Sequence, residues 1–295
     1  MESSNRAVHT PVLLNEVVDM LAVRGNGIYL DATVGLGGHS SAILDRLGSE
    51  GMLIGTDRDE EALASAAKRL GNGRVRLRKK RFSEIGDIVS DLKIDSLDGV
   101  LFDLGVSMFQ LKDYDRGFSF MSEARLDMRM DPSEKLSAWE VVNRYSEKEL
   151  QRILKEFGEE PLFRKIARRI VMSRQSTPIN TCSELAELVF QAYGGRGKTH
   201  PATKTFQALR IEVNKELEEL RNGLSAAVGM LKVGGRICVI AYHSLEDRIV
   251  KNTFRDLSRE RVLRILTKKP IAPVREEVLK NPAARSAKLR GVEKI

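Results

Sequence analysis

The sequence contains only two cysteines, Cys182 and Cys238, and it has no CxxC pair or other cluster of metal ligands. A disulfide framework or a zinc site is therefore not expected, and a reducing cytoplasm is the usual setting for such a chain. No apolar run approaches the roughly 18–20 residues that cross a membrane. The first residues, MESSNR, lack the apolar core of a signal peptide. We predict a cytoplasmic protein without a metal site or membrane segment.

Positive charge is concentrated near the end of the sequence. The net charge is +8, and residues 250–295 contain 13 Lys and Arg against five Asp and Glu. The remaining residues balance at 36 of each sign. A second basic cluster lies within residues 74–81 and consists of Arg74, Arg76, Arg78, Lys79, Lys80 and Arg81. Two basic segments favour a polyanionic partner, most often nucleic acid, although a solvated surface explains either one alone.

A glycine-rich stretch organises the first part of the chain. Residues 31–40 read DATVGLGGHS, between a β-type run at 28–30 and a helix-type run at 41–47. Strand, glycine turn and helix form the first unit of nucleotide-binding α/β folds. Glycine permits the turn and lets the backbone approach a ligand closely. A second strand at 52–56 ends at Asp57, where such folds bind ribose hydroxyls.

Strands and helices alternate up to residue 103 and again after residue 205. This pattern predicts a parallel sheet covered by helices on both faces, an α/β Rossmann-like fold. Strands are expected at 75–78, 97–103 and 236–241, and a long helix at about 205–231. No apolar β-run stands out between about 111 and 210, so we predict an inserted helical domain at 111–212 within a domain formed by 1–110 and 213–295. The last 28 residues, with three prolines, are expected to form an extended arm.

Three aspartates end predicted strands on one rim of the sheet: Asp31, Asp57 and Asp103. Ligands of doubly wound sheets bind at this rim. Carboxylates suit the ribose and the cationic groups of S-adenosylmethionine (SAM), whereas the phosphates of NAD would prefer positive side chains. SAM is therefore favoured, although each aspartate could instead cap the following helix.

Two histidines lie in the predicted rim segments. His39 lies in the glycine loop and is expected to contact the ligand. His243 follows the strand at 236–241, and Ser244 after it is expected to cap the next helix. A Ser–His hydrolase is a poor alternative because the sequence has no GxSxG elbow.

Taken together, these segments resemble the RsmH (MraW) family of SAM-dependent methyltransferases of bacterial small-subunit ribosomal RNA. The resemblance covers nearly the whole chain and rests on long blocks: residues 9–16 (HTPVLLNE), 31–40, 103–107 (DLGVS), 116–120 (RGFSF), 126–131 (LDMRMD), 200–214, 243–251 and 281–290 (NPAARSAKLR). The chain departs from the family where Ala241 and Tyr242 replace the frequent Ser-Phe, and at Lys204, where relatives often have Arg.

The resemblance implies methyl transfer from SAM to N4 of a cytidine in the decoding region of 16S rRNA within the small ribosomal subunit. It implies cofactor-binding residues at Gly37, Gly38, His39, Asp57, Phe82, Asp103 and Gln110. We predict that Asp103, and less directly His243, act in catalysis. Arg285, Lys288 and Arg290 in the basic arm are predicted phosphate contacts. A homo-oligomer is compatible with the sequence.

The cysteines bear on the atom that is methylated. Methylation at cytosine C5 needs a cysteine nucleophile, and neither Cys182 nor Cys238 is predicted to lie on the ligand rim. Exocyclic N4 needs only alignment and a hydrogen-bond acceptor. A DNA amino-methyltransferase and a non-catalytic, SAM-binding ribosome-assembly factor remain alternatives, and an NAD oxidoreductase is a weaker one.

Overall fold

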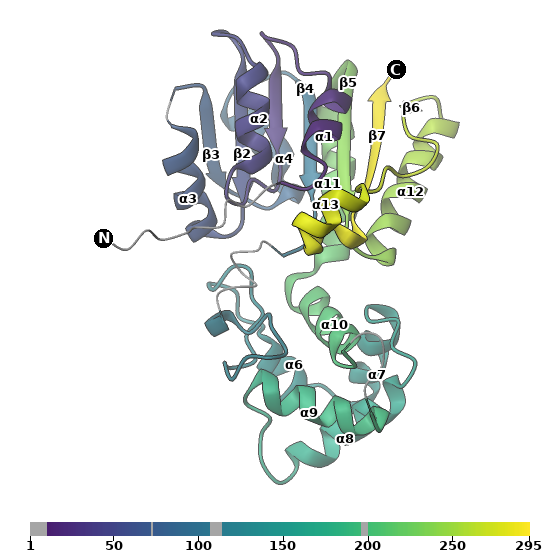
Figure 1. Cartoon of the computed structure of the whole chain (residues 1–295). Coiled ribbons are helices and arrows are strands. Elements are labelled where there is room, and N and C mark those ends of the chain that lie inside the picture. Colours follow the sequence, from purple (N-terminus) through teal and green to yellow (C-terminus); the bar gives the residue numbers. More distant parts are fainter. Residues whose placement is uncertain (1–10, 72, 107–113, 196–199) are drawn as a thin grey trace. The chain divides into compact units, whose positions relative to one another are not determined.

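The computed structural model describes residues 11–71, 73–106, 114–195 and 200–295 (Figure 1). The chain forms two compact units, one made of Met1–Gly105 with Leu217–Ile295 and the other of Val106–Glu216. The predicted insertion at 111–212 lies within the second unit. No helix in the described ranges combines the length and apolarity needed to cross a membrane.

The first unit contains a seven-stranded sheet in the order β3-β2-β1-β4-β5-β7-β6, which confirms the predicted α/β fold. The strands are β1 Ile28–Asp31, β2 Met52–Asp57, β3 Val75–Lys79, β4 Leu97–Asp103, β5 Leu231–Ala241, β6 Leu263–Ile265 and β7 Lys288–Lys294. β1 to β5 pair in parallel, and β7 runs antiparallel to both β5 and β6. β3 lies at an edge of the sheet.

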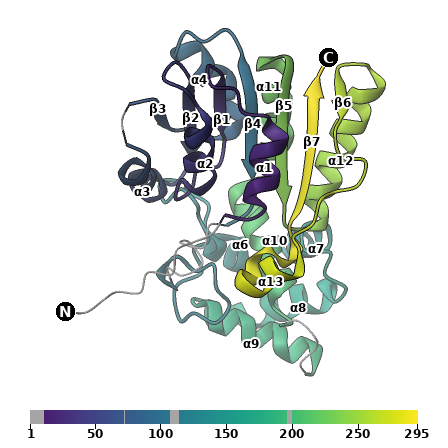
Figure 2. The same ribbon diagram turned by 45° about the horizontal axis from the view of Figure 1, so that its top comes forward.

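Helices cover both faces of this sheet (Figure 2). α1 Leu14–Leu21, α2 Gly38–Arg46 and α3 Glu60–Leu70 pack against one face, and α4 Ile85–Asp91, α11 Glu216–Met230 and α12 Ser244–Arg259 against the other. α13 Arg275–Lys280 and the short 3₁₀ helices η1 Phe82–Glu84 and η3 Pro282–Ser286 complete the unit. Because both faces are covered, the central strands are almost continuously apolar, as expected of parallel sheets.

The predicted extended arm is wrong. Residues 275–295 form α13, η3 and β7, and β7 lies within the sheet between β5 and β6. Leu289 and Val292 of β7 have no exposed surface. Burial of these apolar side chains outweighs the local signals of proline and charge on which the prediction depended.

The predicted long helix at 205–231 is interrupted. α10 Thr203–Asn214 ends at Lys215, which adopts a left-handed conformation with φ 52°, and α11 begins at Glu216. Asn214 is buried, and its side chain accepts a hydrogen bond from the Met130 N–H and donates one to the Met128 carbonyl. These bonds to a distant loop hold the end of α10 in place.

The second unit is helical, as predicted. It contains η2 Tyr114–Arg116, α6 Ala138–Arg144, α7 Glu147–Glu156, α8 Phe163–Arg174, α9 Cys182–Tyr193 and α10. Its core is formed by the apolar faces of these helices. In its described part the β-pairing consists of one isolated bridge, between Arg125 and Thr181. Capping boxes at Ser146 and Thr181 fix the beginnings of α7 and α9.

Candidate functional site

The glycine loop joins β1 to α2 and has little room for side chains. Gly35 and Gly37 have positive φ angles of 49° and 75°, which favour glycine. A Cβ on Gly38 would lie 2.5 Å from Cγ of Pro11. Gly37 is the N-cap of α2 and offers no side chain to bond the first N–H groups of the helix. The loop thus presents backbone toward the carboxyl ends of the strands, where helix N-termini attract negative or polar ligand groups.

Asp31 supports the loop from inside. It is 1% exposed, and its carboxylate accepts hydrogen bonds from the Thr33 N–H at 3.1 Å and the Ser40 hydroxyl at 2.7 Å. Burial raises the pKa of Asp31, against the effect of His39 and the hydrogen bond from Ser40. Asp31 therefore holds the loop in shape instead of lining the ligand rim as expected from its position.

Asp57 ends β2 and remains partly exposed. One oxygen accepts from the Gly35 N–H and the other from the Asp59 N–H, each at 3.0 Å. Burial raises the pKa of Asp57 to about 6, although these two hydrogen bonds oppose the shift. Each oxygen retains a lone pair, so the carboxylate can accept a pair of vicinal hydroxyl groups such as those of a ribose.

Asp103 ends β4 next to the glycine loop. Its N–H donates to the Thr33 hydroxyl at 2.7 Å, which ties β4 to the loop. Oδ1 accepts from the Tyr242 hydroxyl at 2.8 Å, and Oδ2 lies 3.5 Å from Nδ1 of His39. The Asp103 side chain is 24% exposed. The structure thus brings His39 and Asp103 together in one arrangement with an accessible carboxylate.

His39 is buried beneath this arrangement, with 5% of its surface exposed. Its Nε2 lies 2.9 Å from the carbonyl oxygen of Val12. The carbonyl can only accept a hydrogen bond, so Nε2 carries the proton. His39 therefore contacts Asp103 and the loop backbone, and contact between His39 and a ligand stays a prediction.

Phe82, predicted to flank an adenine, lies in η1 directly after β3. Its ring makes an edge-to-face contact with Phe102 at 5.8 Å between ring centroids. The guanidinium carbon of Arg58, the residue after Asp57, lies 5.8 Å from the Phe82 centroid. Asp57 thus ends β2, and Phe82 follows the neighbouring strand β3, at the same rim. Gln110 lies outside the described residues.

His243 is the N-cap of α12, a role the sequence pattern assigned to Ser244. Its Nδ1 accepts from the Glu246 N–H at 3.4 Å, and its Nε2 lies 3.2 Å from Oε1 of Glu246. Oε2 of Glu246 accepts from the His243 N–H at 3.3 Å, which completes the capping box, and also from the Tyr242 N–H at 2.8 Å. The imidazole is engaged at the helix start, and a catalytic role for His243 stays a prediction.

The three predicted phosphate contacts differ in exposure. Arg290, in β7, is only 9% exposed, and its Nε donates to Asp247 at 2.7 Å. Lys288 lies 3.3 Å from the same carboxylate. Although burial opposes the shift, the bonds from these two cations lower the pKa of Asp247. The Arg290 guanidinium is therefore largely buried in an ion pair, whereas Arg285 is exposed, and the phosphate contacts of all three residues stay predictions.

The second basic cluster, at residues 74–81, lies along the edge strand β3 and extends just beyond both of its ends. Three of its cations lie within 4 Å of carboxylates: Lys79 with Glu60, Lys80 with Glu84 and Arg81 with Glu219. The other three, Arg74, Arg76 and Arg78, donate to backbone carbonyl oxygens. Carbonyl partners leave the guanidinium charge uncompensated, so positive charge persists on this edge.

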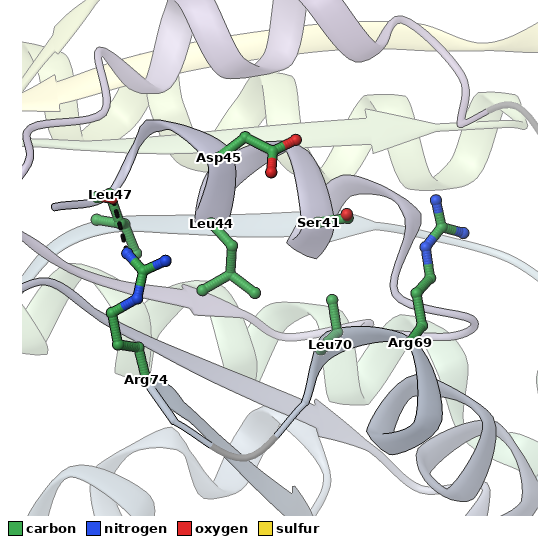
Figure 3. Close-up of a pocket in the computed structure, with 7 residues that line it drawn as sticks. All are labelled: Ser41, Leu44, Asp45, Leu47, Arg69, Leu70 and Arg74. Atoms are coloured by element: carbon green, nitrogen blue, oxygen red, sulfur yellow. Dashed lines mark hydrogen bonds between the residues drawn. The ribbon is translucent and has the colours of Figure 1, made fainter. Parts of the chain in front are cut away.

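A polar groove of about 420 Å³ lies between α2 and α3 (Figure 3). It is lined by Ser41, Leu44, Asp45, Leu47, Arg69, Leu70 and Arg74. Arg74 donates to the Leu47 carbonyl at one end of the groove, and Arg69 lies at the other. Among the residues that the structure describes, none of the predicted site residues lines this groove.

Sequence reasoning missed two residues of the rim, Thr33 and Tyr242. Thr33 accepts from the Asp103 N–H, and Tyr242 donates to the Asp103 carboxylate. Tyr242 follows a predicted strand directly and Thr33 lies within three residues of one, so their position at the rim could have been inferred. Their contact with Asp103 depends on the neighbouring positions of β1, β4 and β5, which local patterns do not specify.

Known proteins match the chain over nearly its whole length. The profile of the MraW methylase family matches residues 6–295. A protein of Persephonella marina called Ribosomal RNA small subunit methyltransferase H is 51% identical, over 97% of this chain and 99% of its own. A protein of the same name from Caldicellulosiruptor saccharolyticus is 48% identical, with 97% and 99% covered.

Similar solved structures include a putative rRNA methylase from Clostridium thermocellum, with 16% identity, a TM-score of 0.47 and coverage of 98% of this chain and 100% of that one. Another is a putative methyltransferase from Streptococcus mutans in complex with SAH, with 15% identity, a TM-score of 0.46 and coverage of 97% and 100%. Identity and TM-score are low for both, so the family assignment depends on the sequence matches.

Proposed function

The chain belongs to the MraW methylase family, and we propose that it transfers a methyl group from SAM to the exocyclic N4 of a cytidine in the decoding region of 16S rRNA. Two of the relatives reported above carry the name of a small-subunit ribosomal RNA methyltransferase. The observation that supports the chemistry is the Asp103 carboxylate, which is partly exposed beside the glycine loop at the carboxyl ends of the strands.

The residues of the rim fit a nucleoside cofactor. Asp57 offers a pair of carboxylate oxygens for ribose hydroxyls, the Gly37–Gly38 backbone allows close approach, and Phe82 supplies an aromatic face near Asp57. SAM, when bound, supplies a methyl group on a positively charged sulfur. We propose that Asp57 and the glycine loop orient the cofactor, and that Asp103 lies closest to the reacting groups.

We favour exocyclic N4 as the target because the Asp103 carboxylate can accept a hydrogen bond from an amine and neither cysteine has an exposed thiol. Burial raises the pKa of the Cys182 thiol to about 12 and also raises that of Cys238, and both side chains have no exposed surface. C5 methylation requires an accessible thiolate. An amine nucleophile instead loses a proton as it gains a methyl group, and the Asp103 carboxylate can accept a hydrogen bond from that amine.

RNA contacts are proposed on two basic surfaces of the first unit. Arg285 is exposed in η3, and Arg76 and Arg78 keep uncompensated charge along β3. Replacing Arg285 by alanine should lower the slope of log K against log salt by about one if it contacts one phosphate. Lys280, exposed and bonded to Glu276, is the matched control. An unchanged slope in R285A would refute this contact.

The function is tested by incubating the purified protein and labelled SAM with small ribosomal subunits from cells that lack the protein. Nucleoside mass spectrometry should find N4-methylated cytidine, and D103A should abolish it with an unchanged thermal unfolding curve. Transfer to duplex DNA instead would favour a DNA methyltransferase. SAM binding without transfer to subunits, free 16S rRNA or DNA would indicate a non-catalytic assembly factor. Near-normal transfer by D103A would refute the role of Asp103.

A further inference from the structure

Tyr242 is placed to control the Asp103 carboxylate. It follows β5 directly, and its hydroxyl donates to Oδ1 of Asp103 at 2.8 Å. Its own N–H is held by Oε2 of Glu246 at 2.8 Å, so both the backbone and the hydroxyl of this tyrosine are fixed. A hydrogen bond to an ionised acceptor is among the stronger ones in proteins.

The Tyr242 ring also packs over the backbone that follows Asp103. Gly105 has φ 99°, and a Cβ on it would lie 3.4 Å from Cδ2 of Tyr242. The turn after β4 therefore brings glycine backbone against the ring. Tyr242 thus contacts the Asp103 segment at two points, the side-chain carboxylate and the main chain two residues later.

The second oxygen of Asp103 faces a different kind of group. Nδ1 of His39 lies 3.5 Å from Oδ2, and Nε2 carries the proton that bonds the Val12 carbonyl. The Tyr242 hydroxyl donates to Oδ1 at the shorter distance of 2.8 Å, and burial and the neighbouring Asp103 raise the pKa of its phenol well above the usual value, which keeps the proton on the hydroxyl.

We propose that Tyr242 is a positioning residue for methyl transfer, which it serves by fixing the Asp103 carboxylate through Oδ1 so that the remaining acceptor capacity points to the amine. This inference depends on the proposed function, in which Asp103 accepts a hydrogen bond from the target amine. Fixed orientation of an acceptor before the reaction lowers the barrier, because less reorganisation is needed as the proton shifts.

The test compares Tyr242→Phe with the wild type in steady-state methylation of small subunits. Y242F keeps the ring on Gly105 and removes only the hydroxyl. We expect kcat to fall about tenfold, as for loss of one hydrogen bond to a charged group, with an unchanged KM for the subunits. A structural defect would instead lower the fraction of active enzyme and the unfolding temperature without this selective fall in kcat per folded molecule.

Tyr29→Phe is the matched control. The Tyr29 hydroxyl accepts from the Arg24 N–H at 2.8 Å in the same unit, away from Asp103, so its loss should affect stability and leave kcat unchanged. If Y242F proves unstable, the same comparison is made at a temperature where both variants are folded by circular dichroism. Wild-type transfer with an unchanged kcat in Y242F would overturn this inference alone. Absence of wild-type transfer would overturn the proposed function and this inference with it.

Discussion

The raised pKa of Asp57 predicts that cofactor affinity depends on pH near 6. Ribose hydroxyls donate to the ionised carboxylate, and protonation removes an acceptor from it. With a pKa of about 6, roughly nine in ten molecules hold an ionised Asp57 at pH 7, and roughly one in ten at pH 5. Affinity for SAM should therefore fall about tenfold between pH 7 and pH 5.

Calorimetric titration with SAM at pH 5, 6 and 7 measures this dependence. The control is Asp57→Asn, which cannot titrate and should bind more weakly at pH 7. Groups other than Asp57 contribute equally to both proteins, so the ratio of their dissociation constants isolates the effect of Asp57. A ratio that stays constant from pH 5 to pH 7 would refute the reasoning.

The raised pKa of Asp57 also affects the stability of the protein without cofactor. Its stability should fall as the pH rises, whereas its affinity for SAM should increase. A carboxyl group whose pKa is higher in the folded state than in the unfolded one favours folding while it is protonated. A shift from 3.8 to about 6 corresponds to about 3 kcal/mol, lost as the pH rises through that range. Urea unfolding at pH 4.5 and 7 should show about 2 kcal/mol of this loss in the wild type relative to D57N, because about 1 kcal/mol is already lost at pH 4.5.

Three further predictions concern packing and the chemistry of the cysteines. Asp247→Ala leaves the buried Arg290 without its carboxylate. Urea denaturation should show that the free energy of unfolding falls by about 3 kcal/mol. A loss below about 0.5 kcal/mol would show that the ion pair does not stabilise the fold. Lys215→Gly should raise that free energy by about 0.5–1 kcal/mol by relieving the left-handed backbone, and a decrease would show that the side chain is needed. Cys182→Ser and Cys238→Ser should each retain methyl transfer in folded protein, and loss in either would contradict N4 chemistry.

Local signals predicted the elements of the first unit where apolar patterning and capping agree. β4 has the predicted bounds, 97–103, and α3 ends at Gly71, whose φ of 70° permits the turn. The parallel part of the sheet also follows from the pattern, because alternating strands and helices leave few other ways to bury their apolar faces. Asp57 and Asp103 could therefore be placed at one rim from the sequence. The place of β7 between β5 and β6 was not predicted.

Local signals failed where a distant partner decides the structure. The break at Lys215 depends on bonds between Asn214 and the backbone of residues 128 and 130. The arm predicted from Pro270, Pro273 and Pro282 is instead a strand with two neighbours. In both cases, the deciding contact joins segments whose pairing no local pattern reveals. Asp31 is a different case: its partners Thr33 and Ser40 lie in the same loop, but nothing in the sequence distinguishes this enclosed carboxylate from Asp57.

The place of β7 between β5 and β6 has a consequence for the order in which the protein forms during synthesis. β5 and β6 leave the ribosome before β7, the strand that pairs with both. Until β7 emerges, β5 keeps an unpaired edge and β6 has no partner in the sheet. The nascent chain therefore holds exposed strand edges over more than 40 residues of synthesis, a period in which it is open to wrong pairing and to chaperones.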